Sequence, residues 1–171
     1  MNLQSTDFEL FAVPPRFAQD AAQLDARWKE LQRQVHPDKF AAQGAAAQRV
    51  AMQWSARINE AYRRLKDPLK RAAYLCELNG APIDAESNTA MPAEFLMQQM
   101  ELREAVDDAV DAAAMDEIGR QSATLKREMI LKLEQQMDAQ HDWPAAAQTV
   151  RALMFLDRLA GDIDRKRATL E

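Results

Sequence analysis

Apolar residues recur at helical spacing in the first part of the chain and predict two long helices. Leu24, Trp28, Leu31 and Val35 are separated by four, three and four residues, so they form one stripe on a helix that Asp20 can cap. A second stripe consists of Ala47, Ala51, Trp54, Ile58, Ala61 and Leu65. Both stripes have near-heptad spacing, which predicts that helices over residues 21–36 and 45–66 pack antiparallel.

Proline, glycine and polar runs divide the rest of the chain. A short helical turn over residues 8–11 ends before a pair of prolines, and Gly80 can close a helix over residues 69–79. Residues 81–92 combine two prolines with Asp, Ser, Asn and Thr and no apolar period, which indicates a linker. Three further helices are predicted over about residues 93–114, 116–140 and 144–169, with residues 41–44 as part of a loop. We therefore expect an all-α protein with an N-terminal domain over residues 1–80, a linker over 81–92 and an antiparallel three-helix bundle over 93–171.

Composition supports the helical class and narrows the chemistry. Glycine is scarce, and no run of β-branched residues alternates with polar ones. The single cysteine excludes an internal disulfide, and two distant histidines give no metal-ligand spacing, so we expect no metal and no cofactor. No apolar stretch approaches a membrane span, and the first residues do not resemble a secretory signal, so the cytoplasm is the expected compartment.

The net charge of −5 is unevenly distributed along the chain. Residues 1–79 carry 12 Lys/Arg and 9 Asp/Glu, whereas residues 80–171 carry 10 and 18. This asymmetry suggests two parts with different partners, and the acidic balance argues against nucleic acid as the main ligand.

The tripeptide His36-Pro37-Asp38 is the first candidate site. Proline disfavours a helical conformation in the residue before it, so the first long helix is expected to end at His36 and leave the tripeptide on an exposed turn. An alternative is that His36 only hydrogen-bonds the last carbonyls of its helix. Basic residues surround the turn: Lys29 and Arg33 lie opposite the apolar stripe, Arg27 flanks the stripe and Lys39 follows the tripeptide. These basic residues form either a recognition strip or an ordinary solvated face.

A second candidate site comes from surplus apolar residues on the helix over residues 93–114. Its core stripe is complete with Phe95, Leu102, Val106, Ala109, Val110 and Ala113. Leu96, Met97 and Met100 fall on the outer face with Glu101 and Glu104, and apolar side chains on an acidic face indicate a binding patch. In the last helix the core stripe is Ala152, Leu153, Leu156, Leu159, Ala160 and Ile163. Phe155 lies roughly 100° from its centre and could join the patch. The alternative is that these surplus residues pack against the first domain.

Four sequence motifs carry a resemblance to a known family. His36-Pro37-Asp38 resembles the signature of J-domains, which stimulate the ATPase of DnaK-type chaperones, and the run from Ile58 to Leu75 resembles the helix pair that follows it in those domains. The runs FLMxQxELRE at residues 95–104 and VRxLxFLDxL at residues 150–159 are more specific. Together they make nearly the whole chain similar to the HscB family of J-protein co-chaperones in bacterial iron–sulfur cluster assembly.

The resemblance implies two partners and no catalytic residues. Contacts with a DnaK-type chaperone (HscA-like) would come from His36, Pro37, Asp38, Arg27, Lys29, Arg33 and Lys39. Contacts with the cluster scaffold (IscU-like) would come from Leu96, Met97, Met100, Glu101, Glu104 and Phe155. The implied protein is not an enzyme, carries no metal or cluster of its own, and is expected to be monomeric without its partners.

Three other functions fit the sequence less well. A general J-protein for unfolded clients usually adds a Gly/Phe-rich segment and CxxC repeats, which this chain lacks. An enzyme using His36 and Asp38 as an acid–base pair would need a nucleophile, a phosphate loop or a metal cluster, and none accompanies them. A purely structural helical adaptor would not need the tripeptide.

Overall fold

A computed structural model describes residues 2–171, in which all regular structure is helical, as predicted. The chain divides into two compact units, Met1–Leu75 and Cys76–Glu171. Each unit is described by itself below.

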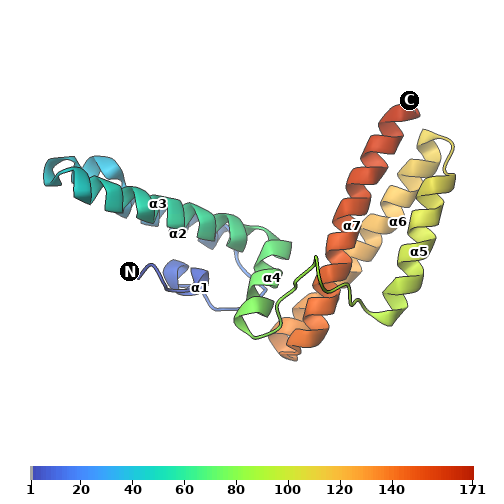
Figure 1. Cartoon of the computed structure of the whole chain (residues 1–171), viewed down its shortest axis with the longest axis horizontal. Helices are drawn as coiled ribbons and strands as arrows, with labels where there is room; N and C mark the ends of the chain where they lie inside the picture. The colour runs from blue at the N-terminus through green and yellow to red at the C-terminus, as the bar shows by residue number, and fades with distance from the viewer. Residues whose placement is uncertain (1) are drawn as a thin grey trace. The chain divides into compact units, whose positions relative to one another are not determined.

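The first unit is built on an antiparallel pair of long helices (Figure 1). The pair consists of α2 (Ala21–Val35) and α3 (Ala45–Lys66), which agree with the predicted ranges. Asp20 caps α2 as predicted, because its carboxylate accepts the backbone N–H groups of Ala22 and Gln23. Between the pair, the predicted loop over residues 41–44 is wrong in part, since a 3₁₀ helix, η1, covers Pro37–Gln43. This unit also contains the shorter α1 (Asp7–Phe11) and the first part of α4 (Pro68–Leu78), whose last residues belong to the second unit.

Polar bonds between α2 and α3 fix how the two helices are aligned. The Trp28 indole N–H and the Gln32 amide both donate to the Asn59 side-chain oxygen at 2.8 Å. Ser55 Oγ donates to Gln32 Oε1 at 2.8 Å. Residues later in α2 therefore contact residues earlier in α3, as expected for antiparallel helices. This places the C-terminal end of α2 beside the N-terminal part of α3.

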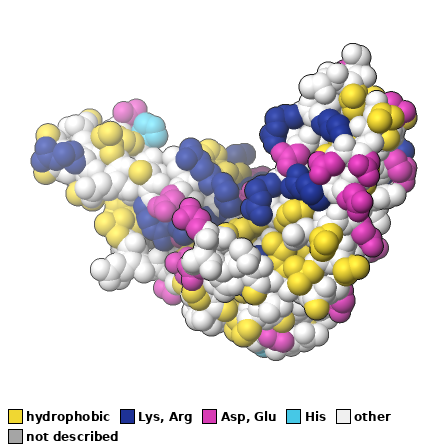
Figure 2. Space-filling model, turned by 45° about the vertical axis from the view of Figure 1, so that its right-hand side comes forward, with side chains coloured by type: hydrophobic (Ala, Val, Ile, Leu, Met, Phe, Trp, Pro, Cys, Tyr) yellow, Lys and Arg dark blue, Asp and Glu magenta, His cyan; other side chains and the backbone are white. Residues whose placement is uncertain are grey.

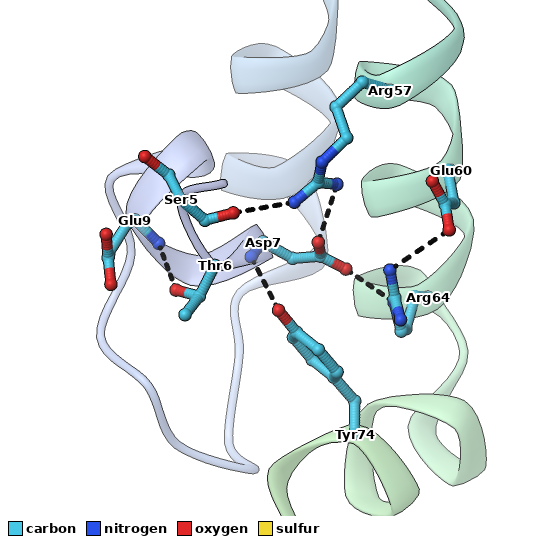
Figure 3. A network of polar contacts seen from close by, with 8 residues as sticks. All are labelled: Ser5, Thr6, Asp7, Glu9, Arg57, Glu60, Arg64 and Tyr74. Carbon is cyan, nitrogen blue, oxygen red and sulfur yellow. Dashed lines mark hydrogen bonds and ion pairs between the residues drawn. The ribbon is translucent and has the colours of Figure 1, made fainter. Parts of the chain in front are cut away.

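A buried carboxylate attaches α1 to the helix pair (Figure 3). The Asp7 side chain is fully buried, with Oδ1 at 2.7 Å from Arg57 Nη1 and Oδ2 at 2.7 Å from Arg64 Nε. The Asp7 backbone N–H donates to the Tyr74 hydroxyl at 3.0 Å. A buried charge needs such pairing because desolvation of an isolated ion is very costly. Asp7 therefore joins α1 to α3 and α4, a link that the sequence analysis did not predict.

The second unit contains an antiparallel three-helix bundle (Figure 1). Its helices are α5 (Ala93–Asp108), α6 (Ala112–Glu134) and α7 (Trp143–Thr169), with a π-helical turn, η2 (Gln135–Ala139), after α6. The predicted α5 was six residues too long. Ala109 is extended at φ −64° and ψ 131°, and the Asp111 carboxylate accepts the Ala114 N–H at 2.7 Å to start the next helix. The Asp111 cap therefore starts a new helix at a point where the apolar pattern alone predicts that α5 continues.

The early end of α5 corrects part of the predicted core. Phe95, Leu102 and Val106 are buried as predicted, but Val110 is exposed and Ala113 is also on the surface, because both follow the break. In α7, Leu153, Leu156, Leu159 and the other predicted core residues are buried, except for Ala160, which is exposed.

Residues 81–92 contain no helix and are held by one arginine. Arg151, buried on α7, donates from Nε to the carbonyl of Ile83 at 3.0 Å and from Nη1 to that of Ala90 at 3.1 Å. Its Nη2 lies 3.4 Å from the carbonyl of Pro82. This segment is therefore fixed to the bundle at both of its ends. Its role as the linker between domains stays a prediction.

Candidate functional site

His36, Pro37 and Asp38 form a turn that is stabilised by its own side chain. His36 ends α2 and also caps η1, since its Nδ1 accepts the backbone N–H of Asp38 at 3.2 Å. The suggestion that His36 bonds the last carbonyls of α2 is wrong, because the ring nitrogen acts as an acceptor for the following turn. In the neutral ring the proton then lies on Nε2. Pro37 occupies the first position of η1, where its missing N–H removes no hydrogen bond within the helix.

The Asp38 carboxylate is the most accessible group of this turn. Its side chain is 92% exposed, and its Oδ2 lies 3.6 Å from the His36 Nδ1. The turn therefore presents a carboxylate, an imidazole N–H and a proline ring to the surroundings. These groups suit recognition by another molecule better than internal packing.

Basic residues near the turn fall into two groups. Lys29, Arg33 and Lys39 are exposed, and Arg33 pairs with Glu30 on the preceding helical turn. Arg27 is partly buried instead, and its Nε donates to the Phe11 carbonyl at 2.8 Å. Arg27 therefore holds the end of α1 against α2, whereas the other three side chains are exposed, and their role as a recognition strip stays a prediction. This difference was not visible in the sequence.

The predicted outer face of α5 is exposed in the structure. Leu96, Met97 and Met100 are 45%, 64% and 66% exposed, and we call these three residues the α5 patch. Glu101 and Glu104 are exposed beside it, and within residues 2–171 neither has an ion-pair partner. Figure 2 shows hydrophobic side chains gathered on the second unit with acidic side chains along their border. Exposed methionines with an acidic border form an adaptable surface for a partner that is apolar at its centre and basic around it.

Phe155 was predicted to join the exposed residues, but its ring is only 7% exposed. It packs edge-to-face on Phe95 with ring centroids 5.8 Å apart, and the Arg103 guanidinium lies 5.5 Å above it. Arg103 also pairs with Asp162 at 2.9 Å, which lowers the pKa of that carboxyl. Phe155 therefore holds α5 against α7 beneath the α5 patch.

The remaining chemistry of the described chain is limited. Residues 2–171 contain no cluster of three or more His, Cys, Asp or Glu side chains arranged to bind a metal ion. Cys76 is fully buried, and this burial raises the pKa of its thiol to about 11. Over the same residues, no helix is both long and apolar enough to cross a membrane.

Comparison with known proteins adds an independent line of evidence. Residues 91–164 match a family model described as the HSCB C-terminal oligomerisation domain. A co-chaperone protein HscB homolog from Burkholderia multivorans is 48% identical over all of this chain and 99% of its own length. The homolog from Bordetella petrii is 48% identical over 94% of this chain and 95% of its own.

Solved structures show the same similarity in three dimensions. Chaperone HscB from Vibrio cholerae superimposes with a TM-score of 0.80 at 35% identity, over 98% of this chain and all of that one. Human co-chaperone protein HscB superimposes with a TM-score of 0.88 at 28% identity, over 99% of this chain and 86% of that one. These structures cover nearly the whole chain and so include both an N-terminal J-domain and a C-terminal three-helix bundle. The chain therefore belongs to the HscB family of co-chaperones.

Proposed function

We propose that this chain stimulates ATP hydrolysis by a DnaK-type, HscA-like chaperone and delivers an IscU-type scaffold to it during iron–sulfur cluster assembly. The observation that carries the proposal is the presence of two chemically different exposed surfaces, one in each unit. The polar turn at His36–Asp38 serves the chaperone, and the α5 patch serves the scaffold. The protein would change the rate of another protein's reaction without being an enzyme, and it would act in the cytoplasm without a cofactor.

The chaperone surface would work mainly through charge. Lys29, Arg33 and Lys39 present positive charge near the turn, which would attract an acidic surface and speed association. Asp38 would then make a short-range contact, because its carboxylate is free to meet a cation of the partner.

The scaffold surface would work mainly through apolar burial. Covering the α5 patch removes three half-exposed apolar side chains from water, and the flexible methionines can fit the partner's shape. Glu101 and Glu104 would favour a basic border on the scaffold. Phe155 would contribute from below, by fixing the position of α5.

The matching family model is described as an oligomerisation domain. For this chain we propose that the oligomer is the complex with scaffold and chaperone, and that the chain alone is monomeric. Light scattering of the purified chain, with and without scaffold, tests this. A dimer of the chain alone would contradict it.

Single-turnover ATP hydrolysis by the cognate DnaK-type chaperone tests the main proposal. This chain and purified IscU-type scaffold are added separately and together. We expect stimulation by the chain alone and a further, more than additive, increase with scaffold. Stimulation that ignores the scaffold would favour a general J-protein for other clients. No stimulation at all would contradict the chaperone role.

A further inference from the structure

A groove between α5 and α6 lies beside the proposed scaffold surface and shares only Glu101 with it. It consists of two hollows of about 470 and 180 Å³, which share the lining residues Gln98, Leu125 and Glu128. The larger hollow is floored by apolar atoms of Leu102 on α5 and Leu125 on α6. Small side chains at Ala105 and Thr124 leave it unfilled. We call this feature the α5/α6 groove.

The charge of the α5/α6 groove is mostly negative and partly unpaired. Four of its lining residues are glutamates and two are basic. Arg120 is already paired with Glu117 at 2.7 Å. Glu101 and Glu128 line opposite walls, one on α5 and one on α6, and within residues 2–171 neither has an ion-pair partner. The groove thus offers two carboxylates above an apolar floor.

The α5/α6 groove is continuous with the α5 patch. Glu101 follows Met100 directly and stands one helical turn after Met97, so it lies between the patch and the groove. A partner that covers the patch therefore brings its own surface to the edge of the groove. No rearrangement of α5 is needed for one partner to contact both.

We propose that the α5/α6 groove receives a segment of the same scaffold protein that covers the α5 patch, and that this segment inserts a lysine or arginine. The aliphatic stem of such a side chain would lie along Leu102 and Leu125, and its charged head would meet Glu101 and Glu128. This inference rests on the proposed scaffold binding and extends its interface from α5 to α6.

Charge reversal on the α6 wall tests the proposal. Glu128→Lys should weaken the affinity of the full chain for purified IscU-type scaffold by about five- to tenfold in calorimetry, and more at low salt, since it replaces an attraction by a repulsion. Asp164→Lys is the matched control, because it makes the same charge change at an exposed α7 position outside the groove. The control should stay within about twofold of the unchanged chain, as expected for a surface charge away from the interface.

A label in the groove gives a second readout. Because the only cysteine is buried, Gln121→Cys places a single accessible thiol on the groove wall for an environment-sensitive fluorophore. Scaffold should shift its emission, and should leave the emission of the same label at Asp164→Cys unchanged. Equal affinity of Glu128→Lys and the unchanged chain, with no emission shift at position 121, would overturn the groove proposal alone. Absence of any scaffold binding by the unchanged chain would instead overturn the proposed function.

Discussion

The two exposed surfaces differ in how the chain builds them. The turn at His36–Asp38 is local: neighbouring residues supply the cap, the proline and the carboxylate, and a hydrogen bond of 3.2 Å within the tripeptide sets its shape. The α5 patch depends on tertiary structure. Phe95, on the opposite side of α5, packs against Phe155, and this packing leaves the patch side chains exposed. The turn can therefore be identified from three neighbouring residues in the sequence. The α5 patch can be identified only when the packing of α5 on the rest of the bundle is also known.

Removing the buried carboxylate of the first unit should have the largest effect. Asp7→Ala removes the buried carboxylate that pairs with both Arg57 and Arg64, and we expect a loss of about 3–5 kcal/mol in the free energy of unfolding of that unit. Denaturant unfolding measures this, with Glu9→Ala as a control that removes an exposed carboxylate from the same short helix. Scaffold affinity should be unchanged by Asp7→Ala. A parallel loss of scaffold binding would show that the two surfaces are not independent.

Asp38→Asn should separate function from stability at the turn. The side chain is 92% exposed and caps no helix, so stability should change by less than about 0.5 kcal/mol. Stimulation of the chaperone should fall at least about tenfold, because a charged hydrogen-bonding group is lost at the contact. Full stimulation by Asp38→Asn in the single-turnover assay would refute the role of this turn.

Alanine substitution of the α5 patch should weaken scaffold binding by about 10- to 100-fold, since three exposed apolar side chains that the scaffold would cover are lost. Calorimetric titration of Leu96→Ala, Met97→Ala and Met100→Ala combined measures the change. Chaperone stimulation without scaffold should remain. Unchanged affinity would remove the α5 patch from the interface.

Phe155→Ala distinguishes support from direct contact. Its ring is buried against Phe95, so the substitution should cost about 3 kcal/mol or more of the bundle's unfolding free energy. The exposed triple variant should cost little stability by comparison. Loss of scaffold affinity in Phe155→Ala with stability intact would instead indicate that the scaffold reaches this ring directly.

Neutralising one basic residue should have the smallest effect. Arg33→Gln removes an exposed charge that already pairs with Glu30, so we expect about a two- to fivefold weaker association with the chaperone, seen mainly at low salt. Binding kinetics over a range of ionic strength measure it. An effect that persists undiminished at high salt would point to a specific contact rather than to charge attraction.

Structure that is set by neighbouring residues in the chain could be predicted from the sequence. The ranges of α2 and α3, the Asp20 cap and the break at His36 all follow from local spacing and backbone preference. The end of α5 was missed because the Asp111 cap competes with an apolar period that favours continuing the helix. Asp111 before a run of three alanines is the local sequence signal for this cap.

Features set by distant residues could not be predicted in this way. Asp7 meets partners 50 and 57 residues away, and Arg151 holds carbonyls more than 60 residues earlier, so no spacing rule identifies either. The α5/α6 groove depends on how closely two helices approach. Helical periodicity gives the face of a helix but not the width of the gap beside it.

The burial of Cys76 has a consequence for the cargo of the proposed complex. Thiolate is the form of cysteine that binds iron, and burial raises the pKa of the Cys76 thiol to about 11, so the thiol stays protonated at neutral pH. In the proposed complex, Cys76 would therefore not compete as a sulfur ligand for a cluster on the scaffold. The proposed scaffold complex could then bring its cluster close to other proteins without losing iron to this thiol.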